Sequence, residues 1–140
     1  VPVAQRYGLG VLPWSPLAAG LLTGKYRRGQ EPAEGTRWAG YPYRDQFDAL
    51  TDIDWNIIET LIAIAEEHDA EPSQIACAWL LSRRVVSSVL GGARTVDQMK
   101  SYIGAAEIKL TEEQVDRLDE ASESKVEPDK VTTPPPPERA

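Results

Sequence analysis

The stretch VVSSVLGGAR, residues 85–94, decides the fold class. Its first six residues form a short run rich in β-branched side chains that ends at a pair of glycines, a pattern typical of a buried strand that runs into a glycine loop. A second short apolar run, VLPWS at residues 11–15, contains Pro13 and is followed by another proline. This run predicts a second strand, whose C-terminal end also enters a loop.

Apolar residues at helical spacing predict helices around these two runs. The last turn of a helix ends at Gly8, a helix capped near Thr51 ends near Asp69, and Pro72 suits the first turn of the next. Two capping boxes open the final helices, at Thr95 with Gln98 and at Thr111 with Gln114. Residues 18–50 lack a sustained period and predict a long loop. Residues 122–140 contain Pro134–Pro137 and predict an unfolded tail.

Two strands joined through helices should be parallel. Parallel strands are stable only inside a wide sheet or a closed barrel, and a pair would leave both edges without a partner. We therefore expect an α/β fold in which this chain is part of a larger barrel. The chain begins with Val1 and not with a methionine, which agrees with that expectation.

The composition fits a soluble globular protein that is one domain or part of one. The chain has 140 residues, of which 41% are hydrophobic and 26% charged, and a net charge of -7. Such a charge, with no stripe of Lys and Arg, disfavours nucleic acids and membrane surfaces as partners. The single cysteine, Cys77, cannot form an internal disulfide and indicates a reduced, cytoplasmic compartment.

The residues alone suggest one anion site. Gly91-Gly92, Arg94 and the capped helix that follows bring backbone N–H groups, a positive helix end and a guanidinium together, which suits a phosphate. A plain turn at the glycines and an ordinary loop cation at Lys25 stay open as alternatives. His68, the one histidine, lies among acidic residues and is expected to be a surface residue.

Residues 11–26, VLPWSPLAAGLLTGKY, resemble the seventh barrel strand and the following loop of the aldo-keto reductases. The segments IACAWLLSRR, VVSSVLGGAR and TVDQMKSYIGAAEIKLTEEQVDRL resemble the same family in the same order. The resemblance covers residues 1–121. Within the family, the sequence is most similar in type to bacterial reductases and to potassium-channel β subunits. It implies the C-terminal fragment of a (β/α)8 barrel, about strands 7 and 8, as a partial domain over 1–121, followed by the tail at 122–140.

The resemblance implies an NADP(H) site. In the family, the aromatic residue at the end of the strand stacks on the nicotinamide, the following residues cradle the pyrophosphate, loop cations cover it, and the glycine loop grips the 2′-phosphate and ribose. The matching residues here are Trp14 for the stacking, Ser15, Pro16, Leu17 and Ala18 for the cradle, Lys25 and Arg37 for the cover, and Gly92, Arg94 and Gln98 for the grip. Arg94 would favour NADP over NAD. Ser101 and Tyr102 depart from a Glu-Asn pair that holds adenine in the family.

The family chemistry is hydride transfer between nicotinamide and a small carbonyl substrate, with a tyrosine as general acid, assisted by lysine, aspartate and histidine. These four residues belong to the first half of the barrel, and none has a counterpart here. We therefore assign no catalytic residue and expect this chain alone to be inactive. A non-catalytic NADP-binding regulatory subunit and an inactive fragment are the alternatives.

Overall fold

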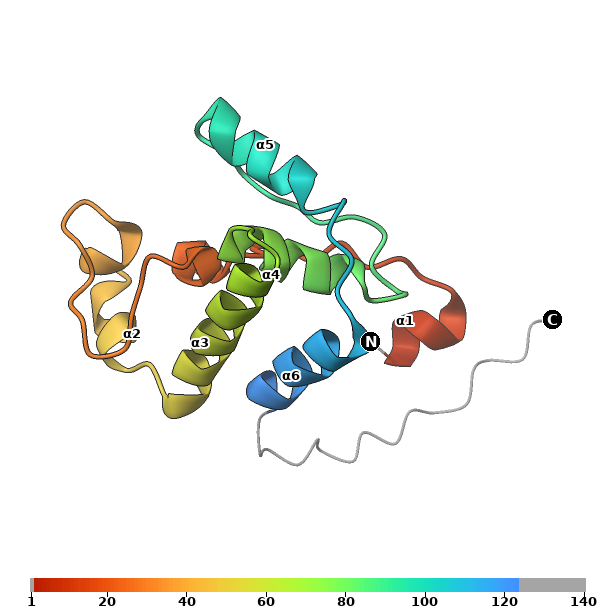
Figure 1. Cartoon of the computed structure of the whole chain (residues 1–140), viewed down its shortest axis with the longest axis horizontal. Coiled ribbons are helices and arrows are strands. Elements are labelled where there is room, and N and C mark those ends of the chain that lie inside the picture. The colour runs from red at the N-terminus through yellow and green to blue at the C-terminus, as the bar shows by residue number, and fades with distance from the viewer. Residues whose placement is uncertain (1, 124–140) are drawn as a thin grey trace.

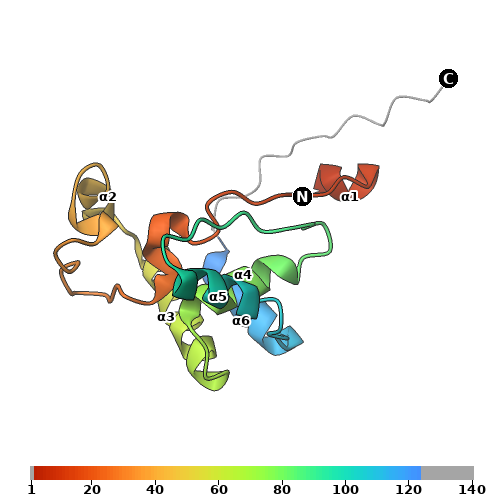
Figure 2. The same ribbon diagram turned by 90° about the horizontal axis from the view of Figure 1, so that it is seen from above.

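The computed structural model describes residues 2–123, and all of its regular elements are helices (Figure 1). In chain order they are α1 Pro2–Tyr7, the 3₁₀ helices η1 Ala18–Thr23 and η2 Arg37–Ala39, and then α2 Arg44–Asp48, α3 Asp52–Glu67, α4 Pro72–Leu81, α5 Val96–Gly104 and α6 Glu112–Ser122. Helices α1 and α2 lie at opposite ends of the molecule in both views, with α3, α4 and α6 between them (Figures 1 and 2). The predicted tail, apart from its first two residues, falls outside the described residues.

The two predicted strands are replaced by a pair of isolated bridges, Val11 with Val86 and Trp14 with Leu90. Both bridges are parallel, as predicted, but the runs 11–15 and 85–90 do not form strands within the described residues. Pro13 lies between the bridges and has no N–H to donate, so the ladder is interrupted there. A parallel pair without neighbours on either edge also lacks the partners that stabilise a sheet.

Helices α3 and α4 begin at the predicted positions. Thr51 and Asp54 exchange side-chain and backbone hydrogen bonds in a capping box, and Pro72 occupies the first turn of α4. The apolar faces of the two helices meet in the main core, where Ile64 and Ile75 are fully buried. Cys77 lies in the same core, as the sequence indicated.

Helix α6 is tied to α3 by polar contacts. The Gln114 amide oxygen accepts hydrogen bonds from the Thr111 N–H at 3.0 Å and from His68 Nε2 at 2.9 Å. The Gln114 amide nitrogen donates to Glu67 at 2.8 Å, and Glu67 also pairs with Arg117. The half-buried His68 is therefore a link between two helices and not the solvated surface residue that the sequence suggested.

A second contact of this kind joins α4 to α6. The Trp79 indole N–H donates to Asp119 at 2.8 Å, and the Arg83 guanidinium pairs with the same carboxylate. That guanidinium also lies 4.3 Å from the centre of the Trp79 ring. These two contacts hold α6 against the α3 and α4 pair.

Residues 18–50 are more ordered than the predicted loop. They contain η1, η2 and α2 and supply most of a second core cluster, made of Leu21, Tyr26, Trp38 and Phe47 with Trp55 and Ile58 of α3. Three aromatic pairs within this region, and a fourth between Phe47 and Trp55, have ring centres 5.3–6.4 Å apart. Contacts between aromatic residues far apart in the sequence thus order a segment that has no helical or strand period.

Gly24 ends η1 with a left-handed backbone, φ 78°. A Cβ atom built there would lie 2.5 Å from Cγ of Pro72, so the turn approaches the start of α4 closely. Glycine is needed here for both its backbone conformation and its lack of a side chain. This close approach holds the end of η1 against the start of α4.

Helix α5 lies on the side of α4 opposite α6 (Figure 1). None of its residues is buried, and its attachment beside α4 is partly polar, since Glu71 accepts hydrogen bonds from Ser73 and Ser101, and partly apolar, since Tyr102 packs against the main core. The apolar side chains of Val96, Met99 and Ile103 are exposed. Across residues 2–123, no helix has the length and apolar character needed to cross a membrane.

Candidate functional site

Trp14 is the most exposed tryptophan of the described chain, with 86% of its surface accessible. It ends the short parallel pairing at its bridge to Leu90, and Ser15 directly after it adopts a left-handed backbone, φ 56°. Ala18 and Ala19 are left-handed as well. Non-glycine residues of this kind are strained, and such strain concentrates at functional sites.

Ser15 organises the turn that follows Trp14. Its carbonyl accepts a 2.9 Å hydrogen bond from the Ala18 N–H, and its hydroxyl oxygen accepts from the Ala19 N–H at 3.3 Å. The hydroxyl hydrogen of Ser15 therefore remains able to donate to a ligand. The N–H of Ala18, which belongs to the predicted pyrophosphate cradle, is thus used within the turn.

Trp14, Ser15, Pro16 and Ala18 line one pocket of about 250 Å³. Its floor comes from apolar side chains of α3, α4 and α6, among them Leu61, Trp79 and Leu118. Leu17 does not line this pocket, because its side chain is buried in the main core. Four of the five predicted residues in this segment thus surround one apolar cavity, and the fifth anchors the segment to the core.

The two predicted loop cations lie beside aromatic rings in or near the second core cluster. Lys25 Nζ lies 6.0 Å from the centre of the Tyr26 ring, and the Arg37 guanidinium lies 5.8 Å from the centre of the Tyr43 ring. Both cations are exposed, and neither pairs with a carboxylate of the described chain. Their charges are available to an anion.

Gly92, Arg94 and Gln98 lie together at the start of α5 and are all exposed. Thr95 caps the helix, since its side chain accepts from the Gln98 N–H. The reciprocal half of the predicted capping box is absent, because the Gln98 amide oxygen accepts a 2.8 Å hydrogen bond from the Arg94 N–H instead. Gln98 therefore holds the backbone that carries the Arg94 guanidinium.

The two groups of predicted residues are neighbours. The Trp14 bridge to Leu90, with a hydrogen bond from the Leu90 N–H to the Pro13 carbonyl at 3.3 Å, places the turn after Trp14 beside the glycine loop. Lys25, Arg37 and the 92–98 group do not line the pocket at Trp14. The structure thus brings the loop ends side by side, while the predicted cations lie outside that pocket.

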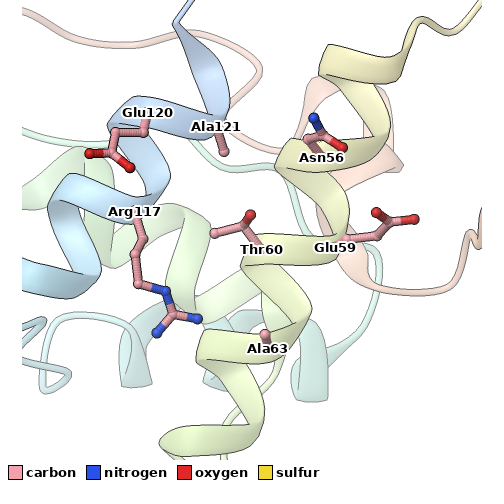
Figure 3. Close-up of a pocket in the computed structure, with 7 residues that line it drawn as sticks. All are labelled: Asn56, Glu59, Thr60, Ala63, Arg117, Glu120 and Ala121. Atoms are coloured by element: carbon pink, nitrogen blue, oxygen red, sulfur yellow. The ribbon is translucent and has the colours of Figure 1, made fainter.

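A larger and shallower hollow of about 540 Å³ lies between α3 and α6 (Figure 3). Arg117, Glu120 and Ala121 contribute to it from α6, and Asn56, Glu59, Thr60 and Ala63 contribute from α3. None of the predicted site residues lines it. Its two acids and one guanidinium do not form the convergent apolar site that ligands prefer.

Two ionisable groups with shifted pKa values, Cys77 and Asp119, have structural roles. Burial raises the pKa of the Cys77 thiol to about 11, so this thiol stays protonated and unreactive at neutral pH. The Arg83 guanidinium, together with the Trp79 indole, lowers the pKa of Asp119. No group of three or more potential metal ligands occurs within residues 2–123.

Two residues that contact the predicted site segments were not predicted from the sequence. Tyr43 lies under Arg37, and Tyr102 packs on Gly91, where a Cβ atom would lie 3.3 Å from the ring. The departure of Tyr102 from the family pattern was its only sequence signal, and Tyr43 had none. Both contacts depend on tertiary packing and have no local pattern.

Comparison with known proteins gives a consistent result. A family model described as "Aldo/keto reductase family" matches residues 1–123. A probable voltage-gated potassium channel subunit beta of Oryza sativa subsp. japonica is 38% identical over 89% of this chain. "Aldo-keto reductase str7" of Strobilurus tenacellus is 34% identical over 80%, and an uncharacterized oxidoreductase of Mycobacterium tuberculosis is 37% identical over 87%.

The chain spans between 33% and 39% of the length of these three relatives. Its similarity to them therefore covers a part of each, and the rest of each relative has no counterpart in the residues compared.

Proposed function

The chain belongs to the aldo/keto reductase family, and from that premise we propose that it is the dinucleotide-binding part of an NADP(H)-dependent oxidoreductase acting on a small carbonyl or alcohol substrate. The family implies a (β/α)8 barrel, and we propose that this chain supplies about its strands 7 and 8. The two parallel bridges, which lie where those strands would run, support that placement.

The observation that carries the proposal is a set of side chains free to contact a ligand, at the paired loop ends and in the segment that follows Trp14. An exposed indole at Trp14 offers a flat apolar face, and the Ser15 hydroxyl can donate. Lys25, Arg37 and Arg94 carry positive charge that no carboxylate of residues 2–123 neutralises. These groups fit a ligand that combines an aromatic ring with several phosphates.

When bound, NADP(H) supplies or accepts the hydride. This chain's residues would hold it: Trp14 against the nicotinamide, Ser15, Pro16, Leu17 and Ala18 with Lys25 and Arg37 at the pyrophosphate, and Gly92, Arg94 and Gln98 at the 2′-phosphate and ribose. The catalytic residues are proposed to lie outside this chain, in a cytoplasmic protein.

Titration of NADPH fluorescence against the full-length protein tests this proposal. We expect saturable binding that is tighter for NADPH than for NADH, because a guanidinium pairs with a 2′-phosphate only in the former. Arg94→Glu should remove that preference, while Glu113→Gln, an exposed change on α6, should not. Equal affinity of the wild-type protein for both dinucleotides would contradict NADP specificity.

A second candidate is an NADP-binding regulatory subunit without turnover. It is favoured by the name of the rice relative, a probable channel β subunit, at 38% identity. Single-turnover mixing of the full-length protein, loaded with NADPH, with aromatic and aliphatic aldehydes distinguishes the two. Oxidation of the bound NADPH supports the enzyme, and stable NADPH fluorescence in the presence of every aldehyde supports the subunit.

A further inference from the structure

The loop of residues 91–94 is fastened to α5 at two points one helical turn apart. At the first point, the Gln98 amide oxygen accepts from the Arg94 N–H at 2.8 Å. At the second, the Tyr102 hydroxyl donates to the Gly92 carbonyl over 3.3 Å. Residues four apart lie on the same face of a helix, so both side chains reach the same loop.

The Tyr102 ring lies close to Gly91 of this loop. A Cβ atom at Gly91 would lie 3.3 Å from both Cε1 and Cζ of the ring, which is tighter than ordinary van der Waals contact. The hydroxyl bond is long for an O–H···O interaction, so the ring contributes more to the fastening than the hydroxyl. A side chain at position 91 would therefore force the Tyr102 ring to shift by a few tenths of an ångström.

The same ring connects the loop to the interior. Tyr102 packs against the main core, which includes Ile75 and Cys77 of α4. Burial, and after it the neighbouring Cys77, raises the pKa of the Tyr102 phenol, which keeps it a neutral donor. The exposed loop thus rests, through one side chain, on the buried main core of the molecule.

We propose that Tyr102 is a positioning residue for Arg94, and that by holding Gly91 and Gly92 it sets the preference for a 2′-phosphorylated dinucleotide. The inference rests on the proposed function, since it requires Arg94 to bind the 2′-phosphate. Arg94 is exposed and has no carboxylate partner in the described chain, so only its backbone limits where the guanidinium lies. A loop fixed before binding loses less conformational entropy when the ligand arrives.

The test compares NADPH and NADH dissociation constants of the full-length protein. Tyr102→Leu, which removes the ring and the hydroxyl, should weaken NADPH binding about 5- to 10-fold and leave NADH binding unchanged. Tyr102→Phe should cost less than about 3-fold, since it keeps the ring. Gly91→Ala should act in the same direction as Tyr102→Leu, because the added methyl group displaces the ring.

Two variants serve as matched controls. Tyr26→Phe removes a hydroxyl that has no hydrogen-bond partner among residues 2–123, and Gly40→Ala adds a methyl group into open space. Both should leave the NADPH to NADH ratio as in the wild type. Thermal unfolding midpoints of all variants show whether a change in binding follows from a loss of folding.

A double-mutant cycle decides whether Tyr102 acts through Arg94. In an Arg94→Ala background, Tyr102→Leu should no longer change the NADPH to NADH ratio. The inference is overturned if Tyr102→Leu weakens both dinucleotides equally, keeps its full effect without Arg94, or has no effect in a wild type that prefers NADPH. A wild type without that preference contradicts the proposed function instead.

Discussion

In the core formed by α3, α4 and α6, side chains are buried or hydrogen-bonded to one another, whereas around Trp14 and on α5 they are exposed. Ile64 and Ile75 are fully buried in the core, and Gln114 makes three hydrogen bonds there. Helix α5 has no buried residue, and Trp14 is 86% exposed. Trp14 and the exposed side chains of α5 are therefore free to contact a ligand, whereas those of the core are not.

The largest change in the free energy of unfolding is expected for a substitution in the core. Ile75→Ala removes a side chain that is 0% exposed, and it should destabilise the protein by about 2–5 kcal/mol, because the cavity cannot fully close. Ile103→Ala on α5, where the side chain is 64% exposed, should change stability by less than about 0.5 kcal/mol. Chemical denaturation of both variants measures the contrast. Similar losses would show that α5 is as well packed as the core.

The next effect is at the polar link between α3 and α6. Gln114→Ala should cost about 1–3 kcal/mol, because it leaves the Thr111 N–H and His68 without their partner and leaves Glu67 with Arg117 alone. Glu113→Ala on the same helix, exposed and outside the link, is the control. Amide exchange should rise at the start of α6 in the first variant alone. Unchanged exchange there would mean that the link does not hold the helix.

A smaller effect is expected on acid stability. Arg83 lowers the folded-state pKa of Asp119, so the pair stabilises the fold above the unfolded carboxyl pKa, about 3.9, and this contribution is lost as pH falls through the lower folded value. Asp119→Asn should therefore flatten the decrease in stability below about pH 4. Denaturation midpoints between pH 2 and 6 measure this. A slope equal to that of the wild type would exclude Asp119 as a source of acid sensitivity.

The smallest stability effect is predicted for the site. Trp14→Ala removes a large but exposed side chain and should change the unfolding free energy by less than about 0.5 kcal/mol. Trp79→Ala, which breaks the contact with Asp119 and Arg83, should cost more. Thermal unfolding of the two variants separates them. A large loss at Trp14 would show that the indole packs and is not held free for a ligand.

Local patterns predicted the scaffold well. The caps at Thr51 and Thr111 and the start at Pro72 were found because each signal lies within four residues of sequence. The box at Thr95 formed only by half, since Gln98 had a competing partner in the Arg94 N–H. The proposed roles of the site residues came from family resemblance and remain predictions.

Contacts distant in sequence were harder to predict. The cluster of Tyr26, Trp38 and Phe47 has no period, and it orders a segment predicted to be a loop. The two runs of β-branched and apolar residues predicted strands, but Pro13 and the lack of neighbouring strands in residues 2–123 reduce them to single bridges. Local sequence propensity does not predict aromatic contacts between distant residues or the presence of neighbouring strands.

The close approach of Gly24 to Pro72 constrains how this protein can be redesigned. A library that varies position 24 alone should return glycine almost exclusively, because every other residue meets both a left-handed backbone and the proline ring. Varying position 72 at the same time relieves the clash but not the backbone strain, so asparagine is the first replacement expected to be tolerated. Thus the turn after η1 and the first turn of α4 can change only as a unit.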